Sequence, residues 1–572
     1  MREENRICQN CRASFVIDAS DFAFYEKIKV PPPTWCPECR LKRRMIFRNE
    51  MVLYKRKCDF TGEMVFSPYS QDKPFKVYKR DIWYSDRWDP IEYGREYAFS
   101  KPFFEQFAEL FLAVPLPSQS LLRAIDSDYC NNAGDLKRCY LLFNSEFSEN
   151  CAYGDGITSC REVSDSYFMK NVEQATEGFA CFNSSLVFYS SDIYDSHDIY
   201  FSKDLVGCAY CFGCVGLRNK SYYIFNKPVP KESYFKQLSA FNLGVHTAIQ
   251  SVLERADEFH LTFPRRFMRG RHNVNVSGDY ITNSRNVYNS FYVDEFENCT
   301  YCYHMGLNPT KECYDFCWGG TAELTYEAVA VGYVENLKFV FECWPDDFDV
   351  SYSILCSGSH HLFGCVGLRQ KQYCILNKQY TKEEYEKLVP RIIEHMNAMP
   401  YADARGRVYR YGEFFPPELS PFAYNETIAQ EYFPLTREQA IEQGYRWRNP
   451  EPRQYQITLQ AQDLPDHIQD VDDSILKKTI ACAHYRGEAS IVNCNEQCTT
   501  AFKIIPQELE FYRKLNLPLP RLCPNCRHYQ RLKQRNPLKL WHRRCTCGGQ
   551  TSENGVYRNT ANHPSHSTDQ HC

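Results

Sequence analysis

Cysteines near both ends of the chain are spaced as metal ligands. At the N-terminal end they form two C-x2-C pairs, made by Cys8, Cys11, Cys36 and Cys39. Near the C-terminal end the spacing predicts a second set, made by Cys494, Cys498, Cys523 and Cys526. Two thiolate pairs that hold one ion from two sides are typical of a closed tetrahedral zinc site. We therefore predict two zinc ribbons, each with one structural ion.

The two cysteine modules are copies of one another. Cys11 and Cys36 are 25 positions apart, as are Cys498 and Cys523, so an offset of 487 residues superposes the modules from Cys11 onward. The first pair of the second module departs from this pattern, because Cys494 and Cys498 are separated by three residues instead of two. Zinc knuckles tolerate such a spacing.

Further cysteines follow the second module. Cys545, Cys547 and the last residue, Cys572, would supply an incomplete third metal site. A chain that stops on a cysteine suggests a truncated reading of a longer gene, whose continuation would complete that site. The alternative is a frayed polar tail without a metal.

An arginine row follows the second cysteine pair of each module. Its members are four positions apart, namely Arg40, Arg44 and Arg48, and then Arg527, Arg531 and Arg535. On a helix this spacing lines three guanidinium groups along one face. Guanidinium binds phosphate in a bidentate way, so one hypothesis is binding of RNA or DNA. A second is docking, on an acidic face of the same chain or on a protein partner, because the net charge of −4 hides basic ends and an acidic middle. A third is a solvated surface without a partner.

The middle of the chain is duplicated as well. FGCVGLRNKSYYIFNK, which begins at Phe212, recurs as FGCVGLRQKQYCILNK from Phe363. Each copy closes a block of short aromatic segments separated by Asn, Ser, Asp and Gly, which is typical of short strands. After the second copy, Thr381 and Glu384 are spaced as the capping box of a helix. We predict a mainly β protein, α+β overall, with a duplicated β-solenoid-like middle rich in Cys and Tyr between two zinc ribbons. A pair of β-sandwiches is the alternative.

These patterns divide the chain into eight segments. They are zinc ribbon 1 (1–60), an aromatic connecting segment (61–125), β-repeat block A (126–228), a helical connector (229–270), β-repeat block B (271–378), a helix with a Pro- and aromatic-rich irregular region (379–481), zinc ribbon 2 (482–548) and a polar tail (549–572).

Signatures of catalysis are sparse, and we predict no catalytic residue. Cys208, Cys211 and Cys214 are spaced like part of an iron–sulfur run, but only Cys214 has a cysteine counterpart in the second repeat. Carboxylates on a solenoid could bind or cleave a glycan, with Asp192, Asp195 and Asp198 as candidates. A metal held by four thiolates leaves no open position for a substrate. We therefore favour a non-catalytic binding or scaffold protein, with nucleic-acid binding and glycan binding or cleavage as the alternatives.

The sequence carries no sign of export or of membrane insertion. No apolar run approaches the roughly 20 residues of a membrane helix, and the first residues lack the apolar core of a signal peptide. The 29 cysteines are then expected to be reduced thiols in the cytoplasm.

The stretches CPECR, CPNCR, RNPLKLWHRRC and GEFFPPELSPFAYNET resemble a family of uncharacterised proteins common in uncultivated small-genome bacteria. Members of that family carry a zinc-ribbon domain at each end, and the resemblance runs from Cys8 to about Cys547. It implies zinc at the eight ribbon cysteines, and it implies no activity.

Overall fold

The computed structural model describes residues 3–303, 309–329, 331–341, 346–449, 455–485 and 496–541. The chain folds into two compact units that do not follow its order. Unit 1 comprises Met1–Ser120, Met268–Asn449 and Leu538–Leu540, and unit 2 comprises Leu121–Phe267, Pro450–Pro537 and Trp541–Cys572. The N-terminal cysteine module therefore folds with the second repeat block, and the C-terminal module folds with the first. Among the described residues, no helix is long and apolar enough to cross a membrane.

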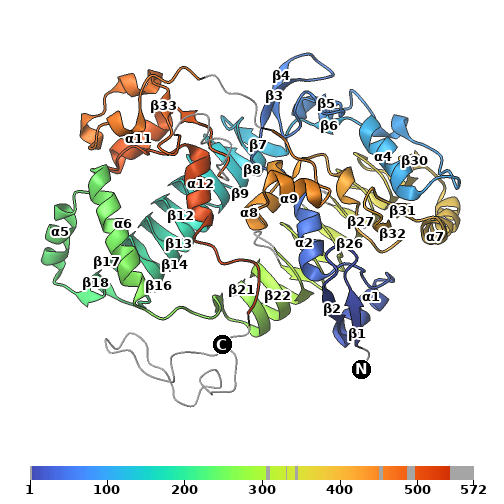
Figure 1. The fold of residues 1–572 in the computed structure, drawn as a ribbon, viewed down its shortest axis with the longest axis horizontal. Coiled ribbons are helices and arrows are strands. Elements are labelled where there is room, and N and C mark those ends of the chain that lie inside the picture. The colour runs from blue at the N-terminus through green and yellow to red at the C-terminus, as the bar shows by residue number, and fades with distance from the viewer. Residues whose placement is uncertain are drawn as a thin grey trace. The chain divides into compact units, whose positions relative to one another are not determined.

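Each unit contains one large sheet that is mostly parallel (Figure 1). In unit 2 its strands are β7 (Leu121–Ile125), β8 (Asn131–Lys137), β9 (Tyr140–Glu146), β10 (Ala152–Thr158), β11 (Arg161–Ser164), β12 (Tyr167–Thr176), β13 (Phe179–Phe188), β14 (Ser191–Tyr194), β15 (His197–Tyr200), β16 (Lys203–Val206), β17 (Ala209–Phe212), β18 (Ser221–Ile224) and β19 (Lys227–Pro228). In unit 1 they are β20 (Gly270–Arg271), β21 (Val274–Thr282), β22 (Arg285–Asp294), β23 (Phe296–Thr300), β24 (Thr310–Lys311), β25 (Ala322–Glu323), β26 (Val334–Lys338), β27 (Asp347–Ser351), β28 (His360–Phe363), β29 (Gln372–Ile375) and β30 (Lys378–Gln379). The prediction of a mainly β protein is confirmed.

A step of twelve residues relates neighbouring strands of the sheet in unit 2. Ala152 pairs in parallel with Tyr140 on one side and with Ser164 on the other, each twelve positions away. The same step pairs Ser185 with His197. Unit 1 follows this register less regularly, with steps that lengthen to thirteen or fourteen residues at Val334↔Asp347 and Phe296↔Thr310.

A left-handed turn at every third residue produces the twelve-residue step. From Asp165 to Tyr189, every third residue has a positive φ between 48° and 58°. Asn and Asp tolerate this conformation better than other residues with a side chain, which explains why they separate the aromatic segments. The residue after each turn is buried, as at Val172, Cys181 and Ile193. From Asp165 to Tyr189 the left-handed turns therefore alternate with residues whose side chains are buried.

Cysteine is frequent among the apolar side chains of the core of each sheet. In unit 2 this core contains Cys130, Cys139, Cys151, Cys160, Cys181, Cys208, Cys211 and Cys214 beside Val, Ile, Leu, Ala and Met. Serine is accepted at the same positions because its hydroxyl is fully bonded: Ser184 donates to Phe182 O and accepts from the Ser196 amide. Cysteine is a compact, readily buried residue that fits such a core without any metal.

Helices close each repeat block as the sequence predicts. α7 (Lys382–Ala398) begins at the Thr381–Glu384 capping box, and both reciprocal hydrogen bonds of the box are formed. In unit 2, α5 (Lys231–Ala240) starts after Pro230 without a side-chain cap and is followed by α6 (His246–Leu261). In unit 1, α4 (Phe103–Ala113) packs on the sheet, with Phe103 against Phe363. The remaining elements of unit 1 outside the cysteine module are β3 (Tyr54–Lys57), β4 (Met64–Ser67), β5 (Val77–Tyr78), α3 (Arg80–Trp83), β6 (Leu116–Pro117), β31 (Tyr401–Ala402), β32 (Val408–Tyr409), α8 (Ala429–Tyr432) and α9 (Arg437–Glu442).

Candidate metal centres and their docking sites

The two cysteine modules have the same fold. Ribbon 1 comprises β1 (Glu4–Ile7), β2 (Ser14–Ile17), α1 (Ala19–Lys27) and α2 (Pro37–Met45). Ribbon 2 comprises β33 (Ile480–Ala481), β34 (Ala501–Phe502), α11 (Pro506–Lys514) and α12 (Pro524–Leu532). In each ribbon the strands form an antiparallel pair, and the second helix starts on a cysteine. The cysteines of each ribbon converge at the turn between the strands and at the start of that helix.

Four thiols meet in ribbon 1. The Sγ atoms of Cys8, Cys11, Cys36 and Cys39 all lie within 4.8 Å of one another, and those of Cys11 and Cys36 are 3.7 Å apart. A tetrahedral zinc ion with Zn–S bonds of about 2.3 Å would hold sulfurs about 3.8 Å apart. The donor set and its spacing therefore fit zinc, and four protein ligands would close the coordination sphere.

Four thiols also meet in ribbon 2, and one of them differs from the predicted set. Cys482 completes the group with Cys498, Cys523 and Cys526. Cys482 Sγ lies 3.8 Å from Cys526 Sγ, and Cys523 Sγ lies 3.9 Å from Cys498 Sγ. The predicted ligand Cys494 lies outside the described residues, as do Cys545, Cys547 and Cys572 of the predicted third site.

Backbone hydrogen bonds identify Cys482 as the counterpart of Cys8. The Cys8 amide donates to Ala13 O, and the Cys482 amide donates to Thr500 O, which is the equivalent residue under the 487-residue offset. The Cys36 amide donates to Cys8 Sγ at 3.2 Å, as the Cys523 amide donates to Cys482 Sγ at 3.3 Å. Ribbon 2 therefore carries an insertion between its first two ligands. The missed signal is the Thr-Ile-Ala run before Cys482, which corresponds to the strand before Cys8.

The second cysteine pair of each ribbon lies at the N-terminus of a helix. Cys36 and Cys523 occupy the N-cap positions, and Pro37 and Pro524 follow at the first helical position, where proline is favoured. The positive end of the helix dipole then stabilises thiolates. Hydrogen bonds from the thiol of Cys36, followed by that of Cys39, lower the pKa of Cys8 well below its usual value.

Ribbon 2 has an imidazole and a carboxylate beside its cysteines. His484 Nδ1 lies 3.0 Å from Glu496 Oε2, and ligand atoms of both residues lie within 4.8 Å of Cys526 Sγ. Both residues belong to the insertion between Cys482 and Cys498. Groups in this position orient the thiolate ligands of a metal and tune their basicity.

The arginine row of ribbon 1 is buried against the acidic sheet of unit 1. Arg40 Nε lies 2.8 Å from Asp315 Oδ2, and Arg44 Nη1 lies 3.1 Å from the other oxygen of the same carboxylate. Arg48 pairs with Glu50 at 2.6 Å inside the ribbon. Arg43, which was not among the predicted residues, pairs with Glu327 at 2.8 Å. These guanidinium groups are at most 3% exposed, so they form no charged surface for a nucleic acid in this structure.

The arginine row of ribbon 2 meets the sheet of unit 2 in the same way. Arg527 and Arg531 both pair with Asp165, and Arg531 also lies 3.2 Å from Glu177. Arg535 donates to the hydroxyl of Tyr167 at 3.1 Å. The last row member is half-buried, whereas the other two are buried.

The same arrangement of two acidic residues pairs with the arginines of each ribbon. Asp315 and Glu327 in unit 1 are twelve residues apart, as are Asp165 and Glu177 in unit 2, and an offset of 150 relates the two pairs. All four residues have a positive φ, so each pair occupies the same corner of successive repeats. The sequence analysis missed these acids, although their spacing repeats in both blocks.

Asp21, beside this docking site in ribbon 1, predicts a pH dependence. Burial and then the charge of Asp18 raise the pKa of Asp21 from 3.8 to about 6. A raised pKa adds stability that is complete below pH 3.8 and is lost as the pH rises through 6. The free energy of unfolding of the native protein minus that of Asp21→Asn should therefore fall between pH 4 and 6, by up to about 3 kcal/mol. Zinc-loaded proteins compared by urea unfolding across this range provide the measurement, and a difference independent of pH would contradict it.

Among the described residues, the cysteines and aspartates singled out in the middle of the chain form no group of three or more metal ligands. Cys208, Cys211 and Cys214 are buried core residues. Asp192 is buried, whereas Asp195 is exposed. Asp198 is half-buried and pairs with His197 at 2.9 Å. The three aspartates lie at successive left-handed turns and differ in burial.

Comparison with known proteins identifies no relative on which to base a function. No protein-family model matches the chain, and a search of curated proteins gives no significant match. The two cysteine groups and their docking sites therefore carry the functional argument, and both groups are compatible with bound zinc.

Proposed function

We propose that the protein is a non-catalytic, zinc-binding scaffold in which two structural zinc ribbons are fastened to a duplicated β-solenoid. The twelve-residue parallel register supports the solenoid. Two groups of four thiols support two closed zinc sites, in which no coordination position is left for a substrate or water.

The repeated docking of the ribbons carries this proposal. In each unit two arginines of a ribbon helix share one buried aspartate of the sheet. Buried charges that lose their partners are costly, so such a set is kept only while ribbon and sheet stay together. Zinc would then fix the shape of the ribbon, and the arginines would fix its place on the sheet.

Limited proteolysis tests the docking directly. Reversal of Arg40, Arg44 and Arg48 to glutamate should release ribbon 1, because the first two new carboxylates would face Asp315 and the third would face Glu50. We expect cleavage after ribbon 1 at least about tenfold faster than in the native protein, with zinc retained in the released fragment. Reversal of Lys55, Lys57 and Lys76 changes the charge equally at exposed positions and serves as the control. Equal digestion of both variants would count against docking.

The same variants test the nucleic-acid alternative. Binding to mixed-sequence RNA and DNA would be measured across a salt series, since phosphate contacts give an affinity that falls steeply with salt. We expect no binding that depends on the arginine rows, because carboxylates pair with every guanidinium group of the two rows except that of Arg535, which bonds to Tyr167. Salt-sensitive binding lost on reversal of Arg40, Arg44 and Arg48, but kept in the lysine control, would favour a nucleic-acid-binding protein instead.

A further inference from the structure

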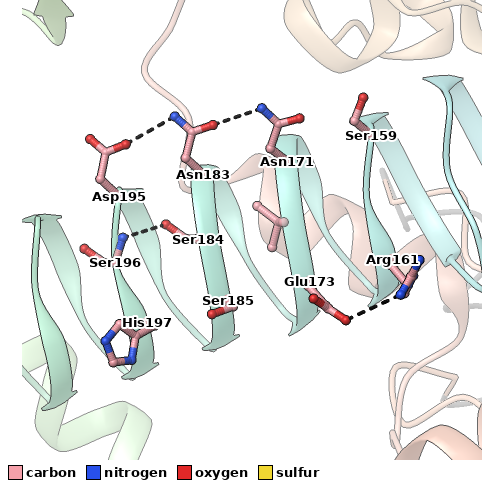
Figure 2. Close-up of a pocket in the computed structure, with 11 residues that line it drawn as sticks. Ser159, Arg161, Asn171, Glu173, Asn183, Ser184, Ser185, Asp195, Ser196 and His197 are labelled. Carbon is pink, nitrogen blue, oxygen red and sulfur yellow. Dashed lines mark hydrogen bonds and ion pairs between the residues drawn. The ribbon is translucent and has the colours of Figure 1, made fainter.

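A groove of about 590 Å³ follows the outer face of the sheet in unit 2 (Figure 2). It crosses four successive repeats, and its lining is almost entirely polar. Two rows of side chains run along it, one made by Ser159, Asn171, Asn183 and Asp195 and the other by Arg161, Glu173, Ser185 and His197. Because the members of each row are twelve residues apart, they follow one another at the spacing of parallel strands, about 4.8 Å.

The first row is held in place by its own hydrogen bonds. Asn171 Nδ2 donates to Asn183 Oδ1 at 3.0 Å, and Asn183 Nδ2 donates to Asp195 Oδ1 at 3.2 Å (Figure 2). All three residues have a positive φ and an exposed side chain. Chained bonds of this kind fix the side chains before a ligand arrives, which lowers the entropy cost of binding.

The second row supplies exposed groups of varied chemistry. Arg161 and Glu173 are 3.9 Å apart and remain 61% and 60% exposed, so their ion pair is weak and open to a ligand. Ser185 adds a hydroxyl, and His197 adds an imidazole at the far end of the row. A ligand in the groove would therefore meet donors and acceptors on both sides, at a regular step.

The chemistry of the lining excludes several classes of ligand. The only apolar residue of the lining, Val172, is buried, so no apolar side chain is exposed in the groove. The lining contains one arginine and two carboxylates, those of Glu173 and Asp195. The carboxylates would repel a polyphosphate. Among the described residues, no group of three or more metal ligands lies in the groove.

An extended chain with neutral hydroxyl groups at regular intervals satisfies what remains. We propose that this groove binds a neutral glycan, whose successive sugar hydroxyls bond to the two rows. Asp192 and Asp198 lie outside the lining, so the aspartates do not supply a facing pair of carboxylates here. The carboxylates of the lining are those of Glu173 and Asp195, one in each row, and the proposal concerns binding alone. This inference depends on the sheet of unit 2 and not on the zinc ribbons.

The two units differ at this face. Counted by the 150-residue offset of the docking acids, Tyr333 of unit 1 corresponds to Asn183 of unit 2. The amide row of unit 2 therefore has no counterpart at that position, although unit 1 has an exposed row of its own at Asn275, Asn286 and Asn298.

Calorimetric titration of the full-length protein tests the proposal. The probes are neutral hexasaccharides of glucose, mannose, xylose and N-acetylglucosamine, with hyaluronan and heparin hexasaccharides as anionic comparisons. We expect at least one neutral probe to bind with a Kd below about 1 mM. Absence of neutral binding at millimolar concentration, or tighter binding of an anionic probe, would overturn the proposal.

Two groove variants locate the binding. Ser185→Trp should block the groove, and Asn183→Gly should remove an amide while permitting the positive φ. We expect each variant to weaken binding by at least about tenfold, with an unchanged circular dichroism spectrum. Ser239→Trp introduces the same side chain at an exposed position of α5 and should bind like the native protein. Native affinity in Ser185→Trp would show that the glycan binds elsewhere and would refute the assignment to this groove.

Discussion

Replacement of Cys482 by serine is expected to remove one bound zinc ion per chain and to unfold ribbon 2. The structure assigns this thiol to the second group of four, in the place that Cys8 has in the first. A structural zinc ion contributes about 10–16 kcal/mol of apparent binding free energy in isolated zinc-finger peptides. Loss of one thiolate should therefore lower the metal content by one ion per chain.

The control for this experiment is Cys494→Ser. The cysteine spacing predicts Cys494 as the fourth ligand, whereas the geometry predicts that its replacement leaves the zinc content unchanged. Metal analysis after dialysis gives the zinc content of both variants, and Cys8→Ser provides the expected loss of one ion from ribbon 1. If Cys494→Ser lost the ion and Cys482→Ser retained it, the ligand set read from spacing would be correct.

Replacement of Asp165 by asparagine is expected to loosen ribbon 2 from its sheet. The Asp165 carboxylate is shared by Arg527 and Arg531, and all three side chains are at most 3% exposed. Removal of one partner from a buried charge set typically costs about 3–5 kcal/mol, because the remaining charges stay buried. Hydrogen exchange of the zinc-loaded protein should then accelerate in β33, α11 and α12 by about a hundredfold or more.

Reciprocal variants make this prediction specific. Asp315→Asn should accelerate exchange in α1 and α2 and leave α11 and α12 unchanged. Asp135→Asn breaks an exposed pair with Arg123 and should cost less than about 1 kcal/mol. If Asp165→Asn left the exchange of ribbon 2 as slow as Asp135→Asn does, the shared aspartate would not hold the ribbon.

Local features of the chain were predictable because their causes are local. A C-P-x-C sequence combines two thiols with a proline at the first helical position, and this is sufficient to define the start of α2. The Thr381 capping box likewise defines the start of α7 within four residues. The set of thiols in ribbon 1 follows from the same reasoning, since short turns bring both pairs together.

Cys482 was missed because spacing along the chain is a poor guide when an insertion separates two ligands. Pairing of β33 with β34 brings Cys482 beside Cys498 regardless of the length of the segment between them. The twelve-residue step was hidden for another reason. It is a repeat of backbone shape, and its core positions accept Cys, Ser, Val, Ala, Gly and Met, so no residue type marks the period.

The partners of the two arginine rows could not be predicted, because they lie far away in the chain. The spacing of Arg40 and Arg44 correctly places them on one face of a helix, but their shared partner Asp315 lies more than 270 positions later. Arg527 and Asp165 are 362 positions apart. Because the two repeat blocks are similar, the sequence alone does not indicate that each ribbon packs on the block that is more distant from it in the chain.

This crossed arrangement has a consequence for synthesis on the ribosome. Ribbon 1 is made first, yet its acidic receptor at Asp315 and Glu327 emerges only after nearly 300 further residues. At about 5–20 residues per second, the nascent ribbon waits roughly 15–60 s with its arginines exposed. The sheet of unit 2 waits in turn for the last ribbon of the chain. Unit 2 cannot be completed before ribbon 2 is made, so a premature stop ahead of ribbon 2 would leave its acidic receptor at Asp165 open.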